Sequence, residues 1–206
     1  VAMDVARMLA LEPSELDTTD TALHALELLH KSRIRKVHLF ARRGPEHAAF
    51  TSPELRELPK LEHTDAVIGS CDIEDAIKRV ESLGEVPKDV RSNLDAMLAI
   101  ANTPSQNRDR SINFHFFASP IEIKGGQRVE EVIFAVNKVE NGKVIQTSET
   151  YSVKTGLIIS AIGYESEAIS GIPYENGKVV NQDGRISDSN MYVVGWAKRG
   201  PSGVIG

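Results

Sequence analysis

Two consecutive arginines, Arg42 and Arg43, are the side chains of this sequence best suited to binding a charged ligand. They follow an apolar run, residues 37–41, that has the character of a buried strand, and Gly44-Pro45 turns the chain directly after them. In a dinucleotide-binding βαβ unit, the end of the second strand lies beside the adenosine ribose. An acidic residue there holds the 2′-hydroxyl of NAD, whereas arginine accommodates the 2′-phosphate of NADP. Two arginines without an acid therefore predict an NADP site; the alternative is a solvated pair at a strand end.

The segment after the arginines predicts the start of a helix. Thr51 and Glu54 have the spacing of a capping box, in which each residue satisfies a backbone N–H of the other. Pro53 lies at the helix start, where its missing N–H would be unpaired anyway. A strand, a turn and a helix are thus expected to position the arginines.

The end of the chain holds a second candidate site. Gly200-Pro201-Ser202-Gly203 follows an apolar run. It is either a tight connection or a strand-to-helix turn that presents backbone N–H groups to an anion or a cofactor ring. Trp196, the only tryptophan, is either a core residue or a stacking partner for a flavin. The residues alone leave both alternatives open.

Other residue types give no sign of a catalytic or metal site. Cys71 is the only cysteine and has no evident basic neighbour, which indicates an inert thiol. No Gly-x-Ser-x-Gly motif is present. The histidines show no metal-ligand spacing; they are His24, His30, His38, His47, His63 and His115.

The composition is that of an ordinary globular protein. Of 206 residues, 41% are hydrophobic and 26% charged, and the net charge of −5 argues against general nucleic-acid binding. No run of about 18 apolar residues exists, so no membrane span is expected. One cysteine is compatible with a reducing compartment. Because the chain begins at Val1 without methionine, we expect it to be a piece of a larger protein.

The first hundred residues read as a parallel α/β arrangement. Apolar spacing predicts helices over residues 1–11, 21–31, 73–83 and 87–101. In the second of these, four leucines are expected to face inward: Leu23, Leu26, Leu28 and Leu29. A short apolar run, residues 66–68, predicts a further parallel strand.

The second hundred residues read mostly as strands. Alternating patterns predict a three-stranded antiparallel excursion formed by residues 112–116, 129–136 and 143–151, with a hairpin turn at Asn141-Gly142. The apolar run 157–162 is expected to be a returning central parallel strand, and residues 191–194 a last buried strand. The expected fold is α/β: a Rossmann-like parallel sheet with helices on both faces and the antiparallel excursion.

Several motifs together resemble the adrenodoxin reductase–type ferredoxin–NADP reductases. They occur in the family's order from the first residue to the last. These motifs are Val1-Ala2-Met3-Asp4-Val5-Ala6-Arg7, Thr19-Asp20 before a leucine-rich helix, Arg42-Arg43-Gly44-Pro45, Ala49-Phe50-Thr51, Glu54-Leu55-Arg56-Glu57-Leu58, and the tail from Gly195-Trp196 to Gly203-Val204-Ile205.

The resemblance implies a flavoprotein with two dinucleotide-binding domains, in which NADPH passes a hydride to FAD and a ferredoxin-type iron–sulfur protein then takes electrons. The NADP-binding domain is inserted into the FAD-binding domain in this family. Residues 1–164 would be the NADP-binding domain without its N-terminal strand and Gly-x-Gly-Asn turn, and residues 165–206 the start of the returning FAD-binding domain.

The resemblance also implies roles for particular residues. Arg42 and Arg43 match the 2′-phosphate arginines, and Glu54 matches a glutamate near the nicotinamide end of NADP. Arg56 is a candidate for docking the acidic iron–sulfur protein. The matches to flavin contacts lie near the end of the chain: Trp196, Gly203, Val204 and Ile205, of which Gly203 also approaches NADP.

Two other functions stay open at this point. One is a related NADPH-dependent flavin reductase module that serves another electron acceptor. The other is an NADP-binding regulatory module without catalysis.

Overall fold

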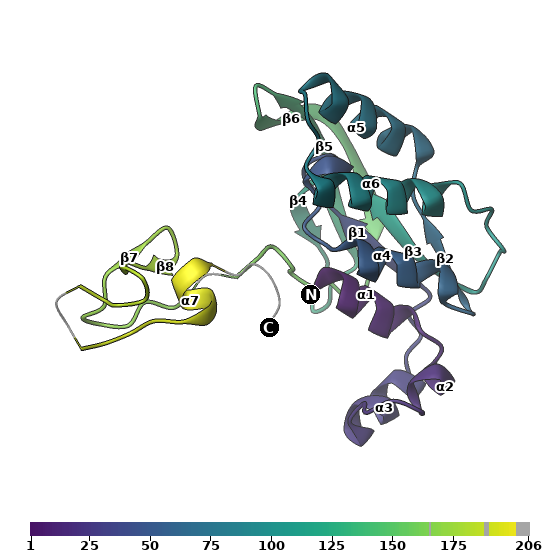
Figure 1. Cartoon of the computed structure of the whole chain (residues 1–206). Helices are drawn as coiled ribbons and strands as arrows, with labels where there is room; N and C mark the ends of the chain where they lie inside the picture. The colour runs from purple at the N-terminus through teal and green to yellow at the C-terminus, as the bar shows by residue number, and fades with distance from the viewer. Residues whose placement is uncertain (165, 188–189, 201–206) are drawn as a thin grey trace. The chain divides into compact units, whose positions relative to one another are not determined.

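A computed structural model of the chain describes residues 1–164, 166–187 and 190–200. The chain divides into two compact units, Val1–Ile158 and Ile159–Gly206. Figure 1 shows the element order along the chain. This division lies close to the expected domain boundary between residues 164 and 165, which stays a prediction.

A three-stranded parallel sheet organises the larger unit. Its strands are β1 (Lys36–Phe40), β3 (Arg110–His115) and β2 (Thr64–Val67), in that spatial order. Residues of β1 and β2 both pair in parallel with β3, which is therefore the central strand. The carboxyl ends of the three strands consequently share one edge of the sheet.

Helices cover the sheet and close the main core. They are α1 (Ala2–Ala10), α4 (Ser52–Glu57), α5 (Ser70–Ser82) and α6 (Lys88–Ala101). Ile112 and Phe114 of β3 are buried in one cluster with residues of all four helices. In α1, Met3, Ala6 and Ala10 are buried because helical spacing brings them to one face. The parallel α/β arrangement is thus confirmed, and α1, α4 and α6 lie in front of the sheet in Figure 1.

The expectation of four inward-facing leucines at residues 21–31 is wrong. This segment forms α3 (Leu23–His30), in which no residue is buried, and Leu23 is 79% exposed. The helix packs mainly on α2 (Pro13–Leu16). A helix of a single turn cannot cover a whole leucine face, so Leu26 and Leu29 are only half-buried and Leu28 is exposed.

The antiparallel excursion is confirmed, but its first strand was misplaced. Residues 112–116 lie largely in β3, and the excursion consists of β4 (Ala118–Lys124), β5 (Glu131–Glu140) and β6 (Lys143–Lys154) in that order. Phe117 has a φ of 54° and turns the chain between β3 and β4 without a glycine to mark the break. Asn141 and Gly142 both have positive φ and form the expected β5–β6 hairpin turn.

Two apolar runs that were expected to be strands are not. Residues 157–162 form no strand pairing, and Ile162 is 95% exposed. A buried parallel strand needs a partner on each side, and no strand in the described part of the chain pairs with this run. In residues 191–194, Tyr192 forms only an isolated bridge with Arg185, and Val193 alone is buried.

The smaller unit has its own modest core. Its elements are the two-stranded β7 (Tyr174–Glu175) and β8 (Lys178–Val179), followed by α7 (Gly195–Arg199). Val179, Ile186 and Val193 are buried together. None of the helices in the described ranges is long and apolar enough to cross a lipid bilayer.

Candidate functional site

Residues 41–45, called the arginine turn below, leave the carboxyl end of β1. Arg42 and Arg43 are exposed, whereas Gly44 and Pro45 are buried. Neither guanidinium has an acidic partner among the described residues. The two adjacent guanidinium groups are thus available to an external anion, while the residues that follow them are buried. Arginine is the side chain best matched to phosphate.

The backbone of the arginine turn is held from two other strands. The carbonyl oxygen of Ala41 accepts a hydrogen bond from Ala118 N at 3.0 Å, and Arg43 O accepts one from Phe117 N at 3.3 Å. Between them, Arg42 O accepts a hydrogen bond of 2.9 Å from Asn137 Nδ2. Three consecutive carbonyl groups are therefore bonded, and the turn is a fixed element rather than a free strand end.

The acidic residue nearest to the arginines in the sequence, Glu46, is bound by another cation. Glu46, in the short helix η1 (Pro45–His47), accepts two hydrogen bonds from Arg79 of α5, at 2.9 and 3.0 Å. Burial raises the pKa of Glu46, but the hydrogen bond and charge of Arg79 outweigh it and leave that pKa below its usual value. Glu46 therefore stays ionised because it is paired with Arg79, and this pairing leaves Arg42 and Arg43 unneutralised.

Gly44 is required for space at the base of the turn. A Cβ atom added there would lie 2.7 Å from Phe117 Cζ and would clash with the Glu46 carboxylate. We expect Gly44→Ala to cost about 1–3 kcal/mol in the free energy of unfolding, as overpacking of a fixed site does. Urea denaturation of the chain measures it, with Gly126→Ala as control because nothing lies within 4 Å of that position. Equal stability of the two variants would show that the turn relaxes freely.

The predicted capping box at the start of α4 is confirmed. Glu54 accepts hydrogen bonds from the backbone N–H of Thr51 at 2.6 Å and from its hydroxyl at 2.9 Å. Pro53 lies in the first turn of the helix. The half-buried Glu54 carboxylate is therefore turned back onto its own helix, and its expected role near nicotinamide stays a prediction.

Arg56 lies on the same helix and borders an open groove. It is exposed, with its Nη2 atom 3.4 Å from Ser92 Oγ of α6. The groove, of about 390 Å³, runs between α4, α6 and η2 (Leu58–Lys60) and is lined mainly by small and apolar residues. Asp95 is the acidic residue on its wall.

The candidate flavin contacts belong to the smaller unit. Trp196 lies in α7 and is 44% exposed, with its ring centroid 6.0 Å from that of Tyr164. A half-exposed indole retains a face for stacking a planar ring. Gly203, Val204 and Ile205 lie outside the described residues, as does the turn between Gly200 and Gly203.

A histidine pair that sequence reasoning missed lies within the parallel sheet, beside an aromatic contact that reaches the antiparallel sheet. His38 Nδ1 and His115 Nε2 are 2.9 Å apart on neighbouring strands β1 and β3. Phe40 stacks on His115 at 4.6 Å and on Phe134 of β5 at 3.8 Å between ring centroids. Burial lowers the pKa of both imidazoles. No cluster of metal-binding side chains occurs in the described ranges.

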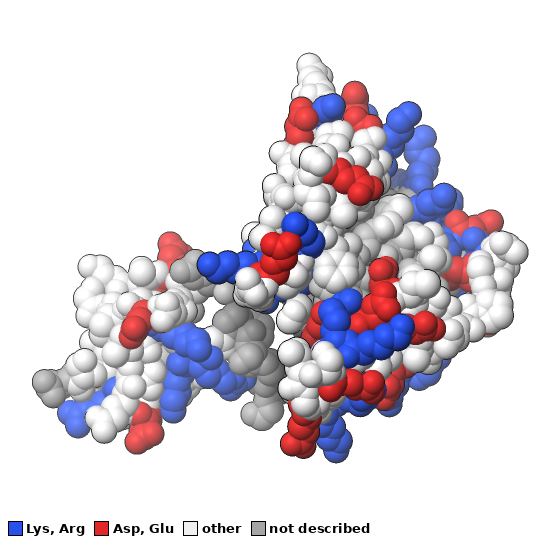
Figure 2. Space-filling view, turned by 90° about the horizontal axis from the view of Figure 1, so that it is seen from above, with Lys and Arg blue, Asp and Glu red and all other residues white. Residues whose placement is uncertain are grey.

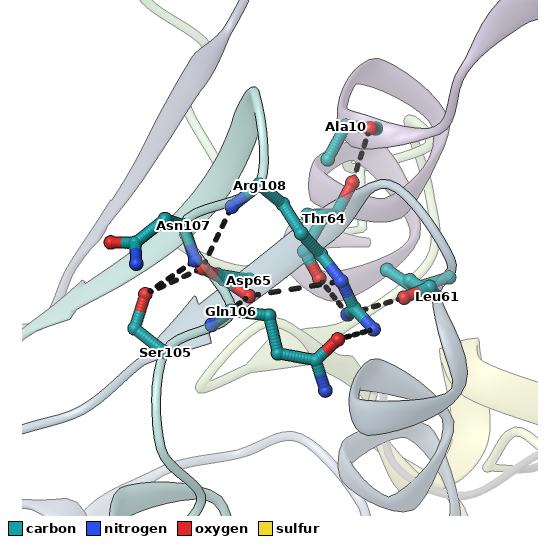
Figure 3. A network of polar contacts seen from close by, with 8 residues as sticks. All are labelled: Ala10, Leu61, Thr64, Asp65, Ser105, Gln106, Asn107 and Arg108. Atoms are coloured by element: carbon teal, nitrogen blue, oxygen red, sulfur yellow. Dashed lines mark hydrogen bonds and ion pairs between the residues drawn. The ribbon is translucent and has the colours of Figure 1, made fainter.

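A second network that the sequence did not reveal lies at the amino edge of the parallel sheet (Figure 3). The buried Asp65 of β2 accepts hydrogen bonds from Ser105 Oγ at 2.7 Å and from the backbone N–H groups of Gln106 and Arg108. Arg108 in turn donates to two backbone carbonyl groups next to and within β2. These bonds fix the connection between α6 and β3, which is the opposite end of the strands from the arginine turn.

Charges elsewhere on the surface are mixed. On the face seen in Figure 2, lysine and arginine side chains are interspersed with acidic ones rather than gathered in one field. The arginine turn is therefore a local cationic site. Its position at the carboxyl edge of a parallel sheet is the usual place for a ligand in this class of fold.

Comparison with known proteins finds relatives over the whole chain. The chain is 39% identical over its whole length to NADPH-ferredoxin reductase FprA of Mycobacterium tuberculosis. It is 34% and 33% identical to the mitochondrial NADPH:adrenodoxin oxidoreductases of Arabidopsis thaliana and Homo sapiens. The chain spans about half the length of these relatives, 46% in the case of FprA. No protein-family model matches it.

Solved structures agree with the sequence relatives. The structure titled "Mycobacterium tuberculosis FprA in complex with NADPH" superposes with a TM-score of 0.86 at 37% identity, covering 98% of this chain and 46% of that one. A second FprA structure gives a TM-score of 0.87. The chain is therefore a homologue of the NADPH–ferredoxin and adrenodoxin reductases over its whole length, and the resemblance seen in its sequence is confirmed.

Proposed function

We propose that the chain is the NADPH-binding part of a FAD-dependent ferredoxin or adrenodoxin reductase, here called the intact reductase. That enzyme would take a hydride from NADPH and deliver electrons to a ferredoxin-type iron–sulfur protein. The observation that carries the proposal is the arginine turn: two exposed, unneutralised arginines on a backbone whose carbonyl groups are all bonded. The names of the relatives and the NADPH complex of FprA support it.

The arginine turn selects the nucleotide in this proposal. Arg42 and Arg43 hold the 2′-phosphate of NADPH, which NADH lacks, through charge-assisted hydrogen bonds. Glu54, at the start of α4, is placed at the nicotinamide end; its carboxylate is preorganised by Thr51. Residues 1–164 form the NADP-binding domain.

Residues 165–206 contribute to the FAD site in this proposal. FAD, when bound, supplies the acceptor of the hydride and the donor of single electrons. The half-exposed face of Trp196 fits a planar partner such as the flavin ring. Gly203, Val204 and Ile205 are proposed to contact the flavin through their backbone.

Arg56 is the proposed docking residue for the electron acceptor. Its exposed guanidinium beside an open groove complements an acidic iron–sulfur protein. Such complementarity acts chiefly on the rate of association. The proposed compartment is the cytoplasm in a bacterium or the mitochondrial matrix in a eukaryote.

Steady-state turnover of the intact reductase tests this function. With NADPH, it should reduce both ferricyanide and a ferredoxin. Arg56→Glu should slow ferredoxin reduction most at low salt, by about tenfold, because a reversed charge opposes encounter with an acidic partner. Ferricyanide reduction should be nearly unchanged.

The matched control is Lys78→Glu, the same charge reversal at an exposed position of α5. It should leave both reactions near their original rates. An equal loss with both acceptors in Arg56→Glu rejects the docking role. Absence of any NADPH-dependent reduction by the unsubstituted enzyme rejects the proposed function and leaves a non-catalytic NADP-binding module.

A further inference from the structure

We infer that Asn137 is a positioning residue for nucleotide selection, because its side-chain amide fixes the peptide group that joins Arg42 to Arg43. This inference rests on the proposed function. It concerns a residue of the antiparallel excursion, 95 positions along the chain from the arginines.

Asn137 is buried at an irregularity of β5. The pairing of β5 with β6 shifts between Ala135 and Asn137, as in a β-bulge, which re-aims a side chain relative to the regular strand. The residue is only 5% exposed. Its backbone N–H donates to Phe117 O at 2.6 Å, which holds β5 against the β3–β4 connection.

The amide group of Asn137 is directed at the arginine turn. Nδ2 donates to Arg42 O at 2.9 Å and to Ser119 Oγ at 2.8 Å. A carbonyl oxygen can only accept, so the nitrogen of the amide must face Arg42. The Oδ1 atom is buried and has no hydrogen-bond partner among the described residues. A buried polar atom without a hydrogen bond lowers the stability of the fold. We therefore attribute the presence of asparagine here to the two hydrogen bonds that its Nδ2 atom donates.

The bond to Arg42 O acts on both arginines at once. That oxygen belongs to the peptide group between Arg42 and Arg43, and a peptide group is planar. The orientation of this plane is set by ψ of Arg42 and φ of Arg43 together, so a bond that fixes it restricts the backbone on which both side chains are carried. Ala118 and Phe117 hold the neighbouring carbonyl groups on either side, but only the Asn137 side chain holds this one in the described structure.

Phe117 adds a second contact between the antiparallel excursion and the arginine turn. Phe117, which bonds both Arg43 and Asn137, is in the left-handed region at φ 54°. Non-glycine residues persist there only when their surroundings determine them strongly. The antiparallel excursion therefore holds the backbone of the arginine turn in place. Asn137 is the residue of the excursion that bonds the peptide group between the two arginines.

The test uses Asn137→Leu in the intact reductase, assayed with NADPH and NADH as donors and ferricyanide as acceptor. Leucine has a similar shape but cannot donate. We expect KM for NADPH to rise about three- to tenfold, the factor that corresponds to one net hydrogen bond. The kcat and the KM for NADH should be nearly unchanged, because NADH has no group for the arginines to hold.

Thr147→Val is the matched control. It removes a hydrogen bond of 2.9 Å to Val136 O, next to Asn137 in the same sheet but not directed at the arginine turn. It should leave both KM values unchanged. Should Asn137→Leu fail to fold, Asn137→Ser is assayed instead, since serine stays polar but is too short to reach Arg42 O.

The outcomes separate this inference from the proposed function. If Arg42→Ala, Arg43→Ala abolishes the NADPH preference but neither Asn137 variant changes it, the inference fails and the proposed function stands. An equal rise in KM for NADPH and NADH assigns Asn137 a merely structural role and also overturns the inference. If the double arginine variant keeps its preference, the proposed phosphate site itself fails. In the double arginine background, Asn137→Leu should have no further effect on KM for NADPH, which is the expected sign that the residues act together.

Discussion

Replacing both Arg42 and Arg43 by alanine in the intact reductase should collapse its preference for NADPH while sparing turnover with NADH. Each charge-assisted hydrogen bond to the 2′-phosphate contributes roughly 1.5–3 kcal/mol. Loss of both side chains should therefore cost on the order of 3–5 kcal/mol, or about 10²–10³-fold or more in NADPH affinity. Steady-state KM values for the two nucleotides measure the effect. Low ionic strength is needed because both guanidinium groups are exposed and salt screens them.

A control variant separates this effect from a change in net charge. Lys31→Ala, Arg33→Ala also removes two exposed positive charges, ahead of β1 rather than after it. It should leave the NADPH preference within about twofold, since distant exposed charges are largely screened. If the double arginine variant kept its full preference for NADPH over NADH, the arginine turn would be only a solvated strand end and not a phosphate site. Single substitutions are less decisive, because the remaining arginine can occupy the phosphate alone.

The second large effect concerns stability and comes from the amino edge of the sheet. Asp65→Ala should lower the free energy of unfolding by about 2–4 kcal/mol near neutral pH, since it removes a buried carboxylate and leaves its three part-buried donors without their acceptor. Figure 3 shows these donors converging on the carboxylate from the 105–108 segment. Urea denaturation of the chain measures the loss, with Glu85→Ala, at an exposed position, as the control. If Asp65→Ala lowers the free energy of unfolding no more than Glu85→Ala does, the donors of residues 105–108 form equivalent hydrogen bonds with water, and the prediction is wrong.

The same carboxylate predicts a pH dependence. Burial raises the pKa of Asp65, but hydrogen bonds from Ser105, Arg108 and Gln106 outweigh it, so the pKa in the folded state is below the ordinary 3.8. A depressed carboxyl pKa contributes stability that is complete above the unfolded pKa and is lost as pH falls through the folded pKa. The difference in unfolding free energy between the unsubstituted chain and Asp65→Ala should thus be constant above about pH 5 and shrink in acid. A difference that grew on acidification would contradict this assignment.

Local signals in the sequence predicted what depends on neighbouring residues. The Thr51–Glu54 capping box and the Asn141-Gly142 hairpin each need only residues a few positions apart. The β3–β4 break was missed because Phe117, not glycine, takes the left-handed conformation there. The alternation of apolar residues gives no sign of such a break, so one strand was assigned to the wrong sheet.

Features that depend on distant partners were not predictable in the same way. The leucine pattern of residues 21–31 predicts a helix with one apolar face. It does not indicate that this face packs mainly on the short helix α2. Residues 157–162 have the composition of a buried strand, yet burial requires flanking strands that are not paired with them here. Asn137 carries no local signal at all, since its significance lies in a contact with Arg42 across two sheets.

The strand order also determines when the arginine turn can form during synthesis. A ribosome makes about 5–20 residues per second, and N-terminal segments begin to fold as they emerge. Strand β1 is made early, but its partner β3 is made only after β2, α5 and α6, because the central strand is the last of the three in the sequence. The Asn137 amide emerges later still. A nascent chain that ends before residue 137 therefore carries both arginines without the fixed turn. The two arginines are neighbours in the sequence, but their backbone is fixed only after the antiparallel excursion has been synthesised and has folded.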